Sequence, residues 1–176
     1  MTATQYHSKD AEMDTNILKR IFAEHRSEGC VIVDWDEWQE RVGKAYAELV
    51  QIARTAPYDR ITITYSQLGQ RIELAPPHLS DWFHLKIAWI LYACATYAYE
   101  HGLPMITALV VNSETGQPGK GFWGLEGIPA QLRKVTKIED ITPFKISGER
   151  DAFWVEELRR IDMWGKTTSQ QSNCKG

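Results

Sequence analysis

The stretch Ile61-Thr-Ile-Thr-Tyr-Ser-Gln-Leu-Gly-Gln-Arg-Ile72 decides the expected fold. Its first five residues are mostly β-branched, which predicts a short strand. Thr64 can cap a helix that follows over 65–72, in which Leu68 and Ile72 lie four residues apart on one face. A strand that runs directly into a capped helix predicts a mixed domain.

Helical periodicity extends on both sides of this stretch. We expect one helix over 15–27 that ends at Gly29, and a second from an N-cap at Asp34 to about Thr55. A long helix from about Leu79 to His101 is apolar almost all round, which predicts burial by this chain or by a second copy in a homodimer. Only its start is polar enough to meet solvent or a ligand, through Ser80, Asp81, His84 and Lys86.

A β-hairpin is expected after the long helix. Met105 to Val111 has the composition of a strand, and residues 112–119 are rich in turn formers before Phe122 and Trp123. A last amphipathic helix is expected from Gly148 or Glu149 to about Trp164. The predicted class is therefore α+β, mainly helical, with a winged helix-turn-helix core over about 37–125 and additional N- and C-terminal helices. We expect a single domain over 15–164, with residues 1–14 and 165–176 disordered.

Two motifs within residues 60–125 resemble a known family. Residues 63–72 are similar to the Thr-Tyr-x-x-Leu-Ala-x-x-Ile stretch that opens the DNA-binding half of alkylguanine-DNA alkyltransferases and alkyltransferase-like proteins. Leu103-Pro-Met-Ile-Thr-Ala-Leu-Val-Val111, with Gly116 and Gly119, resembles that family's proline-containing strand and glycine loop. The resemblance implies a winged helix that contacts DNA.

The resemblance does not extend to the family's chemistry. The family's reactive Cys, followed by His and Arg, has no counterpart in the apolar run from Thr107 to Val110, so alkyl transfer is not implied. In place of the Arg of the family's recognition helix, this chain has only His84 and Lys86. A Leu-Pro-x-x-Thr-x-Leu-Val-Val-Asn strand also resembles small uncharacterised bacterial proteins, which suggests a mobile-element or phage-defence setting.

Composition narrows the functional classes. The chain has 176 residues, including 7 Trp, 7 Tyr and 5 Phe. Its net charge of −3 argues against a nucleic-acid carrier coated in Lys and Arg, although a local basic face is compatible with it. Cys30, Cys94 and Cys174 lie far apart, so we expect a reduced, cytoplasmic protein without a zinc site. No signal peptide, membrane segment, metal or cofactor is expected.

The loop Thr115-Gly-Gln-Pro-Gly-Lys-Gly121 is the sharpest local motif. Its glycines expose backbone N–H groups, and Lys120 could hold a phosphate. The alternative, which the frequency of turn glycines favours, is a hairpin tip whose glycines supply positive φ. Basic residues around it could form a phosphate-facing stripe, or a solvated surface balanced by acids. The candidate contacts for nucleic acid or a partner are Arg71, His84, Lys86, Lys120, Trp123, Arg133 and Lys134.

An acidic cluster, Asp34, Asp36 and Glu37, could hold a metal or act as an acid–base pair, but Asp34 and Glu37 also fit a helix capping box. Trp35, Trp123 and Trp164 lie near element ends, where they could stack on bases or anchor a partner, or pack in the core.

Two functions follow from these features. The first is a non-catalytic binding protein that contacts nucleic acid or regulates a nucleic-acid enzyme. The second is an interaction or inhibitor protein that acts through an aromatic surface. An enzyme that uses the acidic cluster is a weaker alternative.

Overall fold

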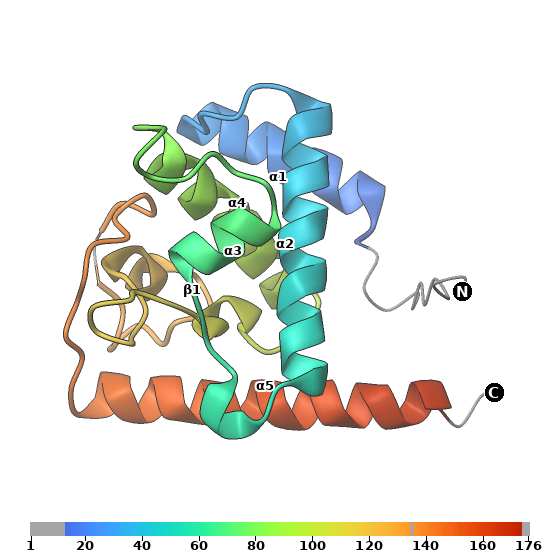
Figure 1. Cartoon of the computed structure of the whole chain (residues 1–176), viewed down its shortest axis with the longest axis vertical. Helices are drawn as coiled ribbons and strands as arrows, with labels where there is room; N and C mark the ends of the chain where they lie inside the picture. The colour runs from blue at the N-terminus through green and yellow to red at the C-terminus, as the bar shows by residue number, and fades with distance from the viewer. Residues whose placement is uncertain (1–12, 135, 174–176) are drawn as a thin grey trace.

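The computed structural model describes residues 13–134 and 136–173, whose arrangement is shown in Figure 1. These residues form five α-helices, joined by short 3-10 helices and two short strands, so the predicted mainly helical α+β class is confirmed. The elements in chain order are α1 (Thr15–Glu28), α2 (Trp35–Thr55), η2 (Tyr58–Arg60), β1 (Ile63–Thr64), α3 (Tyr65–Arg71), α4 (Phe83–Glu100), η3 (Ile106–Leu109), β2 (Val110–Val111), η4 (Lys120–Gly124) and α5 (Glu149–Asn173).

Helices α2 and α3 begin at their predicted capping residues, and α1 ends at the predicted glycine. Asp34 accepts a hydrogen bond of 2.8 Å from the backbone N–H of Glu37 and so caps α2. At the N-terminus of α3, Thr64 and Gln67 form a reciprocal capping box. Gly29 ends α1 with a φ of 103°, a conformation that favours glycine. These predicted helix ends are confirmed. The sequence could predict them because each depends on residues a few positions apart.

The two strands pair in parallel, which corrects the predicted hairpin. Ile63 pairs with Val110 and Thr64 with Val111. Between these strands the chain passes through α3 and α4, so it re-enters the sheet in the same direction. The apolar run that was expected to form one strand is instead a 3-10 helix followed by two strand residues. After β2 the chain turns into η4, and the described residues contain no second wing strand.

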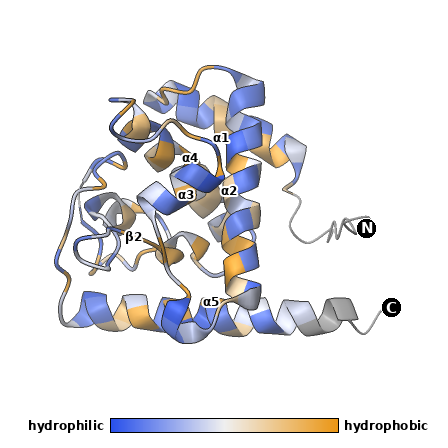
Figure 2. Cartoon of the chain, viewed as in Figure 1, coloured by the Kyte–Doolittle hydropathy of each residue, from blue (hydrophilic) through white to orange (hydrophobic). Residues whose placement is uncertain are grey.

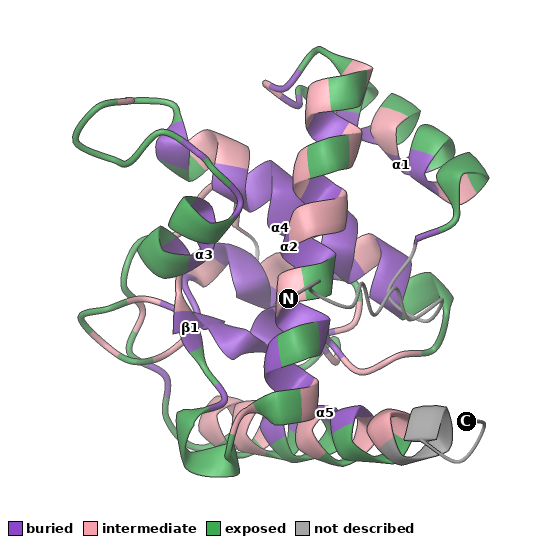
Figure 3. Ribbon diagram, turned by 45° about the vertical axis from the view of Figure 1, so that its right-hand side comes forward, coloured by how far each residue is buried: buried purple, intermediate pink, exposed green. Residues whose placement is uncertain are grey.

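Helix α4 lies at the centre of the fold, and buried residues dominate it in Figure 3. It packs against α1, α2, α3 and η3, so the chain itself covers most of its apolar surface. The homodimer expected from this apolar surface is therefore not needed to explain it. Helix α4 begins at Phe83, later than predicted, because Pro76 to Leu79 forms a turn closed by a 2.9 Å backbone hydrogen bond. Among the described residues, no helix combines the length and apolar character that a bilayer crossing needs.

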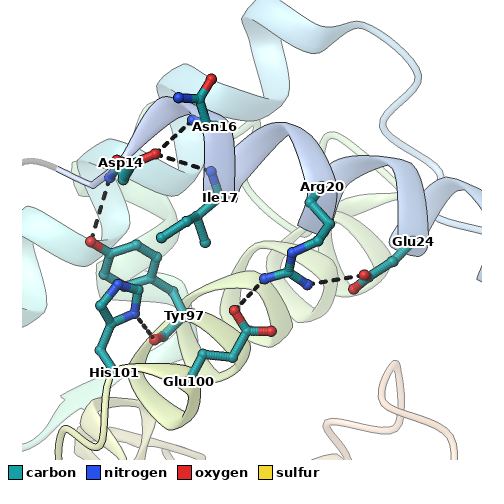
Figure 4. A network of polar contacts seen from close by, with 8 residues as sticks. All are labelled: Asp14, Asn16, Ile17, Arg20, Glu24, Tyr97, Glu100 and His101. Atoms are coloured by element: carbon teal, nitrogen blue, oxygen red, sulfur yellow. Dashed lines mark hydrogen bonds and ion pairs between the residues drawn. The ribbon is translucent and has the colours of Figure 1, made fainter.

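A polar network connects the start of α1 to the end of α4 (Figure 4). The backbone N–H of Asp14 donates to the Tyr97 hydroxyl at 3.4 Å, and Arg20 bonds both Glu24 and Glu100. Asp14 also caps α1, and Met13 before it is buried. The predicted disorder therefore does not extend to these two residues, and the rest of it, over 1–12, lies outside the described residues.

Helix α5 crosses the end of α2 and continues well past the predicted boundary (Figure 1). Hydrophilic and hydrophobic stretches alternate along it in Figure 2, as expected of a helix with one face against the protein. Residues 165–173, predicted to be disordered, are helical. Gly165 makes the crossing close, since a Cβ there would lie 2.2 Å from the backbone oxygen of Ala53. Residues 174–176, including Cys174, lie outside the described residues.

Candidate functional site

A hollow lies between α3, the start of α4 and the end of β2. We call it the α3–α4 cleft, and its volume is about 380 Å³. Its lining is mostly polar and consists of Thr64, Tyr65, Ser66, Pro77, Ser80, Asp81, Phe83, His84, Asn112, Ser113 and Ile141. A cavity of this size is within the range of pockets that bind small molecules or side chains of a partner.

Two walls of the cleft depend on the contact between α3 and α4. The capping box at Thr64 holds the start of α3, and so the position of Ser66. Gly69 lets the two helices approach closely, because a Cβ on it would lie 2.3 Å from the ring of Phe83. The start of α4 is therefore held against α3, with Asp81 and His84 exposed at the cleft.

The third wall is the turn after β2, which Asn112 organises. Its side-chain oxygen accepts the N–H of Glu114 at 2.9 Å, and its backbone oxygen accepts the N–H of Gly116 at 2.9 Å. Tyr65 connects this segment to α3, since its hydroxyl accepts the N–H of Gly119 at 3.1 Å. Burial raises the pKa of Tyr65 to about 12, so its hydroxyl stays neutral at physiological pH. Hydrogen bonds therefore hold the backbone of this third wall in place.

The lining carries one carboxylate, Asp81, and contains no lysine or arginine. Asp81 makes no ion pair within the described residues. In that same part of the chain, no hydrogen bond links His84 to Asp81 or to Ser66, so the cleft holds no assembled nucleophile–base pair. Its chemistry is that of a hydrogen-bonding site with one negative charge.

The predicted contact residues do not gather at the cleft, and most of the cations among them pair with carboxylates. Of these residues only His84 lines the cleft. Lys86 pairs with Glu37 at 2.6 Å, Arg71 with Glu48 at 3.0 Å, and Lys120 with Asp140 at 3.8 Å. The solvated, acid-balanced surface left open as an alternative is therefore what these three cations form.

The remaining predicted contact residues also have partners within the chain. Arg133 donates to the backbone oxygens of Glu126 and Ile128, and Lys134 lies 4.2 Å from the centre of the Phe144 ring. Trp123 is fully buried. It is therefore not accessible to a base or a partner, and the alternative of core packing is the one observed.

The glycine loop is packed against another segment, which corrects its assignment as a hairpin tip or phosphate cradle. The N–H of Lys120 donates to Thr142 at 3.4 Å, and that of Gly121 donates to Asp140 at 2.6 Å. A Cβ on Gly121 would lie 2.4 Å from the backbone oxygen of Ile138. Of the loop glycines, only Gly116 has a positive φ. Close contact with the backbone of Ile141 and Ile138, rather than anion binding, explains why Gly119 and Gly121 are glycines.

The acidic cluster is divided between capping and ion pairing. Asp34 caps α2, and the Glu37 carboxylate bonds Lys86 instead of completing a capping box. The described residues contain no group of three or more His, Cys, Asp or Glu side chains that could hold a metal. Asp36 stands exposed in the first turn of α2. The geometry supplies no support for catalysis by this cluster.

Sequence reasoning missed Ser66, Asn112 and Ser113 as parts of a site. The polar start of the long helix was recognised, but its neighbours in space come from segments far away in sequence. The capping role of Thr64 and the turn composition after Val111 were the available signals. Neither shows that the two segments share one cleft.

Comparison with known proteins adds no assignment. The sequence matches no family model, and searches of the curated proteins and of the solved structures also give no significant match. The function is therefore argued from the geometry of the site.

Proposed function

We propose that this protein is a protein-binding module that docks a segment of a partner into the α3–α4 cleft. The observation that carries the proposal is the combination of the cleft with exposed large apolar side chains on the same loop. Leu79 is 72% exposed and Trp82 is 55% exposed, and the cleft-lining residues Ser80 and Asp81 lie between them. Tryptophan is among the commonest anchors of protein interfaces, because binding removes much of the apolar surface of its large ring from water.

The charge distribution favours a protein over nucleic acid as the partner. Affinity for nucleic acids comes mainly from cations that neutralise phosphates. Lys86, Arg71 and Lys120 already neutralise carboxylates of this chain, and the only carboxylate in the cleft would repel a phosphate. A mixed polar and aromatic surface is typical of protein recognition.

The alternative is the winged-helix protein that contacts nucleic acid. The order of α2, α3 and α4 supports it, since these helices follow one another as the sequence predicts. In that case Lys86 and Lys120 would exchange their present carboxylate partners for phosphates. The two proposals differ in the residues that matter, so one set of variants separates them.

The test uses a display library of random linear peptides, selected on the wild-type protein. We expect selected peptides to lose at least roughly 30-fold in affinity for the Trp82→Ala variant, which corresponds to a hot-spot contact of about 2 kcal/mol. The matched control is Tyr99→Ala, because Tyr99 is 53% exposed at the opposite end of α4. The Tyr99 variant should bind as the wild type does.

Two results would overturn the proposal. One is a failure to select any peptide whose binding depends on Trp82. The other is salt-dependent binding of duplex DNA, single-stranded DNA or RNA that is lost in the double variant Lys86→Ala, Lys120→Ala and kept in Trp82→Ala. That second pattern would establish the winged-helix alternative.

A further inference from the structure

We infer that the docked segment inserts a basic side chain, preferably arginine, into the α3–α4 cleft, where its guanidinium pairs with Asp81. This inference rests on the proposed function and names the chemistry of the segment that the cleft selects. It is carried by the uncompensated charge of the cleft, by its hydrogen-bond acceptors, and by the position of Trp82.

The first argument is charge complementarity. Asp81 is the one carboxylate of the lining, and Lys86, the one lysine or arginine of α4, pairs with Glu37 at 2.6 Å. Lys120, which is not part of the lining, lies 3.8 Å from Asp140, the residue before Ile141. Within the described residues, no lysine or arginine of this chain pairs with Asp81, and His84 is the one basic side chain of the lining. A cationic ligand is attracted by that charge and an anionic one is repelled.

The second argument concerns hydrogen bonding. A guanidinium carries five N–H donors and no acceptor, so it needs several oxygen atoms around it. The lining supplies the hydroxyls of Ser66, Ser80 and Ser113 beside the Asp81 carboxylate. Within the described part of the chain, the Ser66 and Ser113 hydroxyls have no internal hydrogen-bond partner, which leaves their oxygens available to a ligand.

An exposed ring also belongs to the residue that follows Asp81. Trp82 follows Asp81 directly in the chain, and its side chain is more than half exposed. A cation over a tryptophan face is stabilised by the ring quadrupole, and the planar guanidinium of arginine stacks on it better than the ammonium of lysine. Carboxylate and ring together therefore favour arginine over lysine, and either over a neutral side chain.

The experiment titrates the isotopically labelled protein with N-acetyl-arginine N-methylamide and follows its backbone amide resonances. The same titration is run with the citrulline compound, which has nearly the same shape without the charge, and with the glutamate compound and inorganic phosphate. We expect arginine to shift the resonances of Ser66, Asp81, His84 and Ser113, and citrulline to bind about 10-fold more weakly, as a charge-assisted hydrogen bond predicts. Glutamate and phosphate should shift none of these resonances.

Asp81→Asn is the decisive variant, since it keeps the size of the side chain and removes the charge. It should reduce arginine affinity about 10-fold and abolish the difference between arginine and citrulline. Asp36→Asn is the matched control, because Asp36 is an exposed carboxylate in the first turn of α2, outside the cleft. This control should bind arginine as the wild type does.

The outcomes separate this inference from the proposed function. Three results overturn the inference. They are equal affinity for the arginine and citrulline compounds, an Asp81→Asn variant that binds the arginine compound as the wild type does, and binding of phosphate in the cleft. If selected peptides still bind in a Trp82-dependent manner but show no enrichment of basic residues, the proposed function stands and the inference alone is overturned. If no peptide binds at all, both are overturned.

Discussion

His25 makes the stability of this protein depend on pH in a way that can be measured. The side chain lies near the end of α1 and is 2% exposed. Its ring stacks on Tyr92 with 4.4 Å between the ring centres, and Trp89 and Trp38 lie 5.3 and 6.2 Å away. The Nδ1 atom is buried without a hydrogen-bond partner. An imidazolium in this aromatic cage would lose its hydration and gain no compensating bond.

The pKa of His25 sets the size and sign of the effect. Burial lowers it from the ordinary 6.5 to about 4. Between those pH values the unfolded chain binds a proton at this residue and the folded protein does not, so stability falls as the pH falls through this window. Each tenfold difference in proton affinity is worth about 1.4 kcal/mol, so the loss approaches about 3 kcal/mol at pH 4.

Urea denaturation, followed by tryptophan fluorescence at a series of pH values from neutral to 4, measures this loss. The His25→Phe variant keeps an aromatic ring in the cage and removes the titration, so the difference between wild type and variant isolates His25 from the carboxylates. His78→Gln is the control, because His78 is exposed, and it should lose stability with acid as the wild type does. The reasoning is refuted if the wild type and His25→Phe lose the same free energy of unfolding, or if NMR titration of the His25 ring gives a pKa near 6.5.

Two further predictions concern packing contacts of α5. Gly165→Ala should lower the free energy of unfolding by about 1–3 kcal/mol in a thermal unfolding assay, because its Cβ would lie 2.2 Å from the backbone oxygen of Ala53. The control is Gly43→Ala in the interior of α2, where nothing lies within 4 Å of the added Cβ. This variant should raise the free energy of unfolding by up to about 1 kcal/mol in the same assay. Glu157→Leu should lower the free energy of unfolding by about 1–3 kcal/mol, measured by urea denaturation. The buried Glu157 carboxylate accepts the N–H of Met105 at 3.2 Å, and its loss leaves that donor without a partner. An unchanged unfolding midpoint would show that this hydrogen bond makes no net contribution to stability.

The helices and their caps were predictable because the interactions that define them are local. The 3.6-residue periodicity of α1 and α2, the cap at Asp34 and the capping box at Thr64 all involve residues within one or two turns. The class of the domain follows from these elements. The start of α4 was misplaced because the turn after Pro76 is as compatible with the sequence as an earlier helix start.

The strand pairing and the candidate site were not predictable in the same way. An apolar run such as Met105 to Val111 fits a buried strand or a buried 3-10 helix equally well, and only its packing against α4 and α5 selects between them. The Lys86–Glu37 ion pair joins residues 49 positions apart, so no local pattern indicates that this cation is occupied. The three walls of the α3–α4 cleft likewise come from separate parts of the chain.

The sequence by itself determined a mainly helical α+β domain, the ends of its first helices and the polar start of α4. Only the tertiary structure decided that the strands pair in parallel, that the glycine loop packs against residues 138–142, and that Asp81 makes no ion pair with another described residue. The reason is that caps and helical periodicity act over a few residues, whereas burial and charge compensation depend on which distant segments the fold brings into contact.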